Sequence, residues 1–366
     1  MIKGTIGILT MHRVRNCGSF LQAFALQHTL ECMGCKTEII DYMYPNAFHQ
    51  LEVYDNPVSL HNALDGLYPN LRHRRWWALS IQWQQIKWLV MLHSKLKLSN
   101  RTYYTSEDLK SNPPVYNAYL LGSDQVWNER FMKCDPSFFL AFAPKEAPKM
   151  AFASSVPNTH FSELFIKNVQ EYVTQFKNIA MREKASAMAL KPYVGKDVKY
   201  VLDPVFLLSD EEWNKILGLR TKKRNYVLCF VLDYMGHVKG NVLTQLNTFL
   251  EQHRDMRVYA NGDYIKYPKP TKVGDVLPKQ FVELIANAAY VITDSFHATA
   301  YSILYGVPVM PIISDKQHDI RILDMCERLG EVDTDGFVHA DADKLKEERK
   351  IMSDVLKDMV IDWSLV

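Results

Sequence analysis

His297 is the residue of this chain whose type and position best suit chemistry. It follows the short apolar run Val291–Thr293, which predicts a buried strand, and it lies within Ser295–Tyr305, whose apolar spacing predicts a helix. Where a parallel strand passes into a helix, the edge of the sheet is open to ligands, and the first amide groups of the helix attract anions. A histidine at such a junction is placed to meet a phosphorylated or carboxylated substrate.

Asp294 and Ser295, which directly precede that helix, each have two interpretations. Aspartate and serine in this place commonly cap a helix by accepting hydrogen bonds from its first amides. The alternative is a contact with substrate through the Asp294 carboxylate or the Ser295 hydroxyl. The residue types leave both interpretations open.

A second polar cluster follows the predicted strand Ala118–Leu121. Asp124 and Gln125 lie in the turn GSDQVWN directly after that strand, so we expect them at the carboxyl edge of the first sheet, opposite His297. The Asp124 carboxylate could accept a proton from an attacking hydroxyl, or the sequence GSD could only form the turn. Trp127 offers an aromatic face to a sugar ring, although a place in the core is the commoner role of tryptophan.

An anionic substrate requires cationic donors, and arginine matches phosphate and carboxylate groups through its planar fork. The candidate arginines are Arg182, Arg13, Arg15 and Arg321. Arg182 ranks first because it opens a predicted helix after a strand. Arg13 and Arg15 flank the first loop, where Asn16 and Gly18 would let the backbone approach a ligand. Each arginine could instead be an ordinary solvated surface residue.

Alternating strands and helices position these residues. Thr5–Thr10 predicts a strand, Phe20–Met33 a helix and Lys36–Asp41 a second strand, which together form a βαβ unit with a parallel sheet. A second α/β half begins at the predicted strand Tyr226–Leu232. Further predicted elements are a strand and loop over Met150–Pro157, a strand and turn over Val201–Leu208, and the strands Asn178–Met181 and Arg257–Ala260. The predicted helices are Phe161–Phe176, Asn241–His253 and Phe281–Ala286.

This order of elements predicts an α/β protein with two Rossmann-like domains that face each other across a cleft. We expect the N-terminal domain over residues 1–215, with a helical insertion at about 45–117. The C-terminal domain is expected over residues 224–345, and a C-terminal helix over 346–366.

The insertion contains an unusual basic segment with four tryptophans, Trp76, Trp77, Trp83 and Trp88, and it predicts one or two helices. Its apolar positions fall on more than one face, which favours packing between domains. The alternative is a surface that docks near a membrane-linked or extended substrate, so peripheral membrane contact is a second expectation. Charges interrupt the segment too often for it to span a bilayer.

Composition limits the classes of function. The 43 Lys+Arg nearly balance the 41 Asp+Glu, so no global field favours a nucleic acid partner. The N-terminal apolar stretch is too short for a signal peptide, and we expect a cytoplasmic protein. The six cysteines lack the spacing of a disulfide scaffold, and the lone pair Cys32 and Cys35 has no second pair to complete a zinc site, so we expect reduced, structural thiols.

Motifs for common cofactors are missing from the sequence. The twelve histidines show no paired ligand spacing and the aspartates are dispersed, so we expect no metal. Neither GxGxxG nor the Walker pattern occurs, so a dinucleotide or ATP would lack its usual phosphate-binding loop.

Five segments in this order resemble the polysaccharide pyruvyl transferase family. They are Asn16–Leu26, Leu120–Asn128, Met181–Ser186, Val201–Leu208 and Phe281–Val309. The resemblance implies a GT-B-like arrangement of two Rossmann-like domains and transfer of a pyruvyl group from phosphoenolpyruvate onto sugar hydroxyls as a ketal. It also implies a saccharide acceptor, free or lipid-linked, in polysaccharide biosynthesis, with phosphoenolpyruvate as donor substrate and no cofactor. Many members have arginine where this chain has Ser295.

This chemistry needs a proton on the methylene carbon of an enol phosphate, and a histidine suits that step because it holds and releases protons near neutral pH. We assign this role to His297 as a hypothesis. Two other classes stay open: a GT-B glycosyltransferase that uses a nucleotide sugar, and a noncatalytic carbohydrate-binding protein. The acceptor sugar, the hydroxyls joined, the stereochemistry of the ketal and the oligomeric state cannot be read from the sequence.

Overall fold

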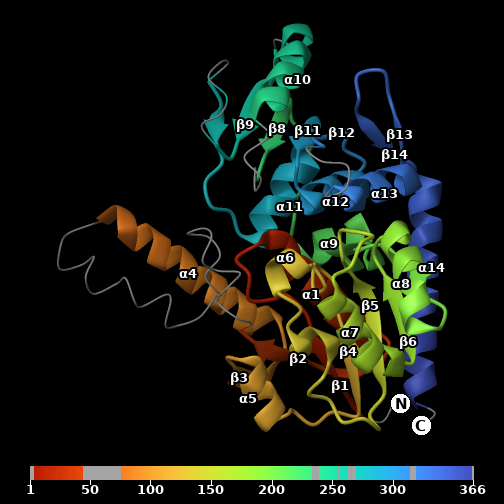
Figure 1. Cartoon of the computed structure of the whole chain (residues 1–366). Helices are drawn as coiled ribbons and strands as arrows, with labels where there is room; N and C mark the ends of the chain where they lie inside the picture. The colour runs from red at the N-terminus through yellow and green to blue at the C-terminus, as the bar shows by residue number, and fades with distance from the viewer. Residues whose placement is uncertain are drawn as a thin grey trace. The chain divides into compact units, whose positions relative to one another are not determined.

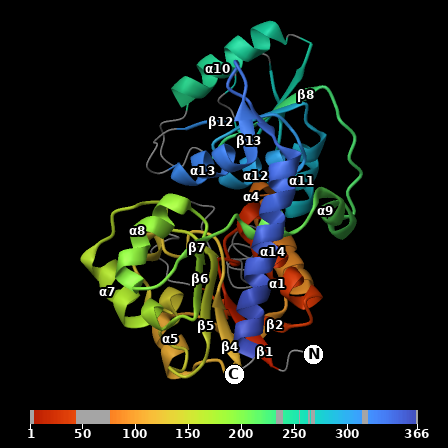
Figure 2. The same cartoon turned by 90° about the vertical axis from the view of Figure 1, so that its right-hand side faces the viewer.

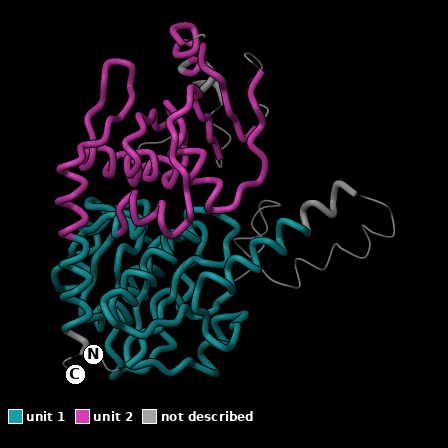
Figure 3. The backbone as a smooth tube through the Cα atoms, turned by 180° about the vertical axis from the view of Figure 1, so that it is seen from behind, with its two compact units in different colours: residues 1–207, 352–366 teal, residues 208–351 magenta. Residues whose placement is uncertain are grey.

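The computed structural model of this chain describes residues 4–43, 76–232, 239–253, 255–262, 265, 269–313 and 319–364. The chain forms two compact units, which Figure 3 distinguishes by colour. Unit 1 comprises Met1–Leu207 and Met352–Val366, and unit 2 comprises Leu208–Ile351. The division between the units falls after Leu207 rather than after the predicted residue 215. The last helix, α14, covers Ala342–Ser364 and so begins before the predicted residue 346.

Unit 1 is built on a seven-stranded sheet with the order β3-β2-β1-β4-β5-β6-β7. The strands are β1 (Thr5–Leu9), β2 (Lys36–Tyr42), β3 (Leu98–Tyr103), β4 (Ala118–Leu121), β5 (Lys149–Ser154), β6 (Asn178–Met181) and β7 (Lys199–Tyr200). All neighbouring pairs are parallel. The strand order reverses between β1 and β4, and such a switch point is the usual ligand-binding place of an open α/β sheet.

Helices cover both faces of this sheet, with α7 and α8 on one side and α1 on the other (Figure 2). The helices of unit 1 are α1 (Cys17–Cys32), α4 (Trp76–Lys95), α5 (Ser106–Ser111), α6 (Glu129–Met132), α7 (Glu163–Tyr172) and α8 (Lys184–Val194). Because both faces are covered, the central strands are nearly continuous apolar runs, as parallel sheets require. β4 and β5 are buried along their whole length.

The predicted insertion is not purely helical, which corrects the sequence prediction. A helix does form at Trp76–Lys95, but β3 belongs to the main sheet and pairs with β2. This edge strand is half-exposed and has the sequence LSNRTY, so it lacks the apolar run that marks a buried strand. The first part of the insertion, residues 44–75, lies outside the described residues.

Of the strand and turn predicted over Val201–Leu208, the strand ends earlier than expected and the turn is found. The strand there is β7, which ends at Tyr200, and Pro204–Leu207 forms a 3-10 helix. Pro204 has no amide hydrogen for a strand ladder and its φ is fixed, so it favours the turn. The apolar run is buried all the same, because the residues of the 3-10 helix pack into the core.

Unit 2 repeats the same plan with the strand order β10-β9-β8-β11-β12-β14-β13. The strands are β8 (Tyr226–Phe230), β9 (Arg257–Ala260), β10 (Thr271–Lys272), β11 (Tyr290–Thr293), β12 (Val309–Pro311), β13 (Gly330–Val332) and β14 (Val338–Ala340). Pairing is parallel from β10 to β12 and antiparallel through β14 and β13. The switch point of this sheet lies between β8 and β11.

Alternate side chains of β8 pack against helices on opposite faces of this second sheet. Cys229 shares a buried cluster with Phe249 of α10 (Lys239–Gln252). Phe230 instead meets Phe281 of α11 (Pro278–Asn287), with 5.3 Å between the ring centres. The other helices are α9 (Asp210–Leu217), α12 (Phe296–Leu304) and α13 (Ile320–Leu329), and Figure 1 labels them all.

Candidate functional site

The carboxyl ends of β8 and β11 are tied together by side chains at the switch point of unit 2. Asp294 accepts a hydrogen bond from the Leu232 amide through Oδ1 at 2.7 Å. The hydroxyl of Thr293 donates to the carbonyl oxygen of Phe230 and accepts from the Ser295 amide at 3.0 Å. Asp294 therefore fixes the chain that leaves β8.

Ser295 is the helix cap, in agreement with one of its two interpretations. Its hydroxyl accepts from the Ala298 amide at 3.3 Å, and its backbone is extended, as a cap residue requires. The Asp294 carboxylate accepts from the Leu232 amide in the chain that follows β8. The predicted strand and helix around His297 are confirmed, with β11 at Tyr290–Thr293 and α12 at Phe296–Leu304.

His297 lies in the first turn of α12 and is 7% exposed. Its ring meets the edge of Phe296, with 5.2 Å between the ring centres and an interplanar angle of 87°. The guanidinium carbon of Arg321, on α13, lies 5.7 Å from the centre of the same Phe296 ring. The structure thus brings two predicted site residues, His297 and Arg321, to one aromatic side chain at the switch point.

Asp124 holds the corresponding position in unit 1. It has a φ of 71°, a left-handed conformation that is uncommon outside glycine, and it is 5% exposed. Ser19 of α1 donates its hydroxyl hydrogen to Asp124 Oδ2, and the Gln125 amide donates to Oδ1 at 2.8 Å. The Asp124 carbonyl accepts from the Ser155 amide at 3.1 Å, so this turn is locked to the end of β5. A strained conformation held this firmly is a mark of functional sites.

Arg182 is fully buried within a ring of carboxylates, at 3% exposure. Its Nη1 donates to Asp203 at 2.7 Å and its Nε to Glu183 at 3.2 Å. Burial alone would lower the pKa of this guanidinium, but the charges of Glu183, Asp203 and Asp124 outweigh burial and raise it. Arg182 is neither the solvated surface arginine of one interpretation nor an exposed fork for a substrate, and its contacts assign it to holding these carboxylates in place.

The sequence analysis missed the partners in this network. Ser123 donates to Asp203 at 3.2 Å, and Ser155 donates to Glu183. Asp203 lies inside an apolar run, VLDPVFLL, and a carboxylate in such surroundings needs a buried partner. That pattern was the available signal, although it does not identify which arginine pairs with it.

Arg13 is engaged in a second buried ion cluster. Its Nε donates to Asp41 Oδ1 at 2.6 Å, and His12 Nε2 lies 3.0 Å from the same oxygen. Burial tends to raise the pKa of Asp41, but hydrogen bonds and charge from His12 and Arg13 hold it well below its usual range. Thr102 of β3 also donates to Asp41. At 3% exposure, Arg13 is therefore a structural cation of the β1–β2 edge.

Asn16, Gly18 and Arg15 complete the loop after β1. Asn16 caps α1, because its Oδ1 accepts from the Gly18 amide at 2.8 Å and from the Ser19 amide at 3.3 Å. This cap explains why α1 begins at Cys17, three residues before the predicted Phe20. Arg15 is partly exposed beside this cap.

Trp127 belongs to the core, which supports the commoner of its two interpretations. It is 1% exposed, its Nε1 donates to the Phe138 carbonyl at 2.9 Å, and its ring stacks near Phe139 at 6.1 Å. Both faces of the indole are therefore unavailable to a sugar ring in this structure.

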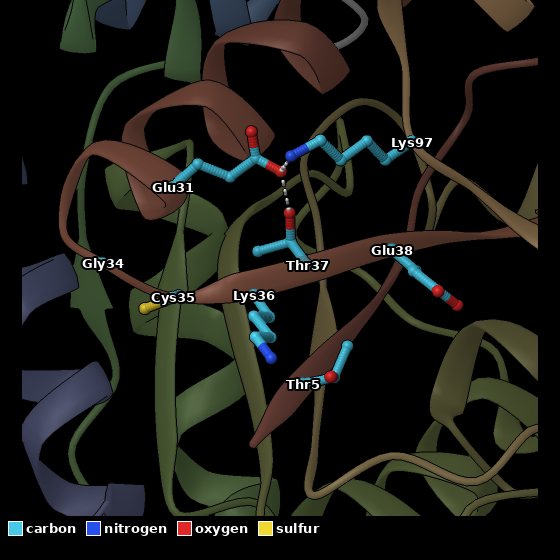
Figure 4. Close-up of a pocket in the computed structure, with 8 residues that line it drawn as sticks. All are labelled: Thr5, Glu31, Gly34, Cys35, Lys36, Thr37, Glu38 and Lys97. Atoms are coloured by element: carbon cyan, nitrogen blue, oxygen red, sulfur yellow. Dashed lines mark hydrogen bonds and ion pairs between the residues drawn. The ribbon is translucent and has the colours of Figure 1, made fainter. Parts of the chain in front are cut away.

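Two hollows in the described residues lie away from both switch points. One, of about 410 Å³, opens at the amino ends of β1 and β2, where Lys97 and the Thr37 hydroxyl both point at Glu31 (Figure 4). The other, of about 460 Å³, runs along α11 beside Tyr226 and Tyr259. Parallel sheets bind substrates at their carboxyl edges, so we place the candidate site at the switch points instead.

Further tests of site chemistry concern metals and membranes. In the part of the chain that the structure describes, no three His, Cys, Asp or Glu side chains converge as metal ligands. Among the same residues, every helix is too short or too polar to cross a bilayer.

The two Rossmann-like units give an α/β fold of the GT-B-like kind, as the resemblance implied. A similar fold is found in the crystal structure of UDP-GlcNAc 2-epimerase from Neisseria meningitidis bound to UDP-GlcNAc, with a TM-score of 0.52 and 9% sequence identity. The superposition covers 98% of this chain and 99% of the epimerase. The epimerase from Methanocaldococcus jannaschii gives 10% identity and a TM-score of 0.51, covering 96% and 92%. At such identities the similarity concerns the fold alone.

The chain belongs to the polysaccharide pyruvyl transferase family, an enzyme family, whose sequence model matches residues 16–316. No curated protein matches the sequence. The match confirms the resemblance drawn from the five motifs, and it spans the switch-point loops of both units.

Proposed function

We propose that this enzyme transfers a pyruvyl group from phosphoenolpyruvate onto two hydroxyls of a saccharide and so forms a ketal. The family match supports this class of reaction. The single observation that carries the mechanism is the place of His297 in the first turn of α12, directly after β11 at the switch point of unit 2. A titratable ring at a helix amino terminus meets an anionic substrate there.

The proposed reaction begins when His297 donates a proton to the methylene carbon of phosphoenolpyruvate. Positive charge then develops on the carbon that bears the phosphate, and the first sugar hydroxyl bonds to it. Phosphate departs with its bridging oxygen, and the second hydroxyl closes the ketal. Of the two hydroxyl protons released, one restores the histidine and one leaves with phosphate. Proton transfer of this kind contributes about 10²–10⁴-fold to a rate.

Other residues have supporting roles in the proposal. Asp124 accepts the proton of an attacking hydroxyl, since its carboxylate is oriented by Ser19 and its strained turn is fixed to β5. Arg321 contacts the anionic donor, because its guanidinium lies over Phe296 beside His297. Gln125 and Arg15 contribute polar contacts from unit 1, and the acceptor is a saccharide, free or lipid-linked.

The test is phosphate release from phosphoenolpyruvate in the presence of candidate saccharides, followed by phosphorus NMR and by mass spectrometry of the sugar. Acceptor-dependent release with a ketal product supports the proposal. Release of a nucleotide from a nucleotide sugar, without turnover of phosphoenolpyruvate, would assign the enzyme to glycosyl transfer instead. Sugar binding without either release would make the protein a noncatalytic binder.

A further inference from the structure

Helix α4 has one buried face and one unpartnered face in the described residues. Gln85, Trp88 and Leu92 point inward, and the Trp88 ring meets Phe20 of α1 at 6.5 Å. On the outer face, Trp83 is 58% exposed and Val90, seven residues further on, is 62% exposed. Residues seven apart lie on one side of a helix, so these two apolar side chains form a stripe. The helix projects from unit 1 in Figure 1.

Lys87 lies on the same stripe, one turn after Trp83. Its ammonium nitrogen is 5.7 Å from the centre of the Trp83 ring. Of the tryptophans whose side chains the structure describes, Trp83 alone is exposed; Trp88, Trp127 and Trp213 are buried. An indole left in water beside a lysine is the combination that membrane-surface helices use.

The charge of this region has one sign. Helix α4, from Trp76 to Lys95, contains the basic residues Lys87 and Lys95 and neither Asp nor Glu, whereas Lys97 and Arg101, which follow it, are paired with Glu31 and Asp108. Three arginines, Arg72, Arg74 and Arg75, directly precede the helix in the sequence. In a chain whose total charge is nearly balanced, such a local excess favours an anionic partner.

We propose that the outer face of α4, formed by Trp83, Lys87 and Val90, docks on an anionic lipid surface. The indole and valine enter the boundary between headgroups and acyl chains, and Lys87 meets lipid phosphates. This goes beyond pyruvyl transfer and does not depend on it.

A second copy of the chain fits this face less well than a lipid surface does. A two-fold contact would bring each basic stripe against itself, because the same patch appears on both sides of such an interface. Two exposed apolar side chains also supply far less area than the roughly 800 Å² per partner of a stable interface. An anionic lipid surface complements the basic charge through its headgroups and the small apolar stripe through its acyl chains.

The experiment is cosedimentation of the full chain with vesicles of phosphatidylcholine alone and of phosphatidylcholine with about a third phosphatidylglycerol, a composition that gives a negative surface. We expect at least about tenfold tighter binding to the anionic vesicles, weakened by salt. Lys87→Gln should weaken that binding about fivefold. Trp83→Gln should weaken it about tenfold, since a half-exposed indole would no longer leave water.

Two matched controls lie on the other edge of unit 1. Met188→Gln removes an exposed apolar side chain of α8, 66% exposed, and Lys199→Gln removes an exposed charge of β7. Both should bind the vesicles as the unchanged protein does. All variants should retain their circular dichroism, because none of the substituted side chains is buried.

Equal binding to neutral and anionic vesicles would overturn the proposal, as would α4 variants that bind like the controls. A change from dimer to monomer in Trp83→Gln, measured by light scattering without lipid, would assign the face to self-association and also overturn it. None of these measurements requires turnover, so they are independent of the proposed reaction.

Discussion

The carboxyl edges of the two sheets differ in how they use charge. In unit 1, Arg182 is enclosed by Asp203 and Glu183, and Arg13 by Asp41, all of them buried. In unit 2, the junction around α12 is organised by the hydroxyls of Thr293 and Ser295 and by one carboxylate, Asp294. Ion pairs stabilise the first edge, and hydrogen bonds from backbone amides to two hydroxyls and one carboxylate organise the second.

This difference teaches how to separate structural from chemical residues at sheet edges. A buried arginine that already donates to two carboxylates stabilises the fold through those hydrogen bonds. Removing one of the carboxylates leaves a buried charge without compensation. His297 lies instead in the first turn of α12, at a junction held by the Thr293 and Ser295 hydroxyls and by Asp294. We therefore expect substitutions in unit 1 to affect folding first, and substitution of His297 to affect catalysis first.

The largest expected effect is on turnover in His297→Asn. Asparagine keeps a polar side chain but cannot donate a proton as imidazolium does, so kcat/KM should fall by about 10³-fold or more. The free energy of unfolding, measured in urea, should fall by no more than about 1–3 kcal/mol, because His297 is buried but the Ser295 cap stays in place, so the variant should remain folded. Retention of most activity would remove His297 from the chemical step.

The second prediction concerns the ion network of unit 1. Asp203→Asn removes the charge that faces Arg182, and we expect a loss of about 3–5 kcal/mol in the free energy of unfolding of unit 1. The matched control is Asp197→Asn, which breaks the exposed pair between Lys191 and Asp197, and should cost at most about 1 kcal/mol. Similar losses in the two variants would show that the buried network has no special role in folding.

The third prediction uses pH. The pKa of Asp41 is lowered in the folded chain relative to about 3.9 when unfolded. Its ion pairs therefore stabilise the fold fully above that value, and the contribution is lost as pH falls towards the folded pKa. Asp41→Asn should be less stable than the unchanged protein at neutral pH, and the gap should narrow below about pH 4. Urea unfolding of both proteins at a series of pH values measures this difference in stability. A difference that stays constant with pH would contradict the stabilising role of the charged Asp41.

Much of the fold could be predicted because buried parallel strands are continuous apolar runs. Ala118–Leu121, Asn178–Met181 and Arg257–Ala260 match β4, β6 and β9 to the residue. The strand β3 could not be predicted in this way, since its sequence is polar and only its pairing with β2 makes it a strand.

The site was predictable in its position and less so in its contacts. The βα junctions of Asp124 and His297 follow from sequence periodicity, which the structure confirms for their strands. The burial of Arg182 and Arg13 does not follow from sequence periodicity. Arg182 pairs with Asp203 and Arg13 with Asp41, and both carboxylates are more than 20 residues away in the sequence; only Glu183 is a sequence neighbour. An arginine after a strand looks the same in a sequence whether it faces solvent, substrate or a buried aspartate.

The smallest expected effect separates the core from the acceptor site at Trp127. Trp127→Phe keeps an aromatic ring but leaves the buried Phe138 carbonyl without the indole donor, at a cost of about 1–3 kcal/mol in unfolding. Because the ring is enclosed by Phe139 and Phe165, we expect the KM for the saccharide to stay unchanged. A raised acceptor KM with unaltered stability would mean that the indole reaches the sugar, and that this edge of unit 1 opens in solution.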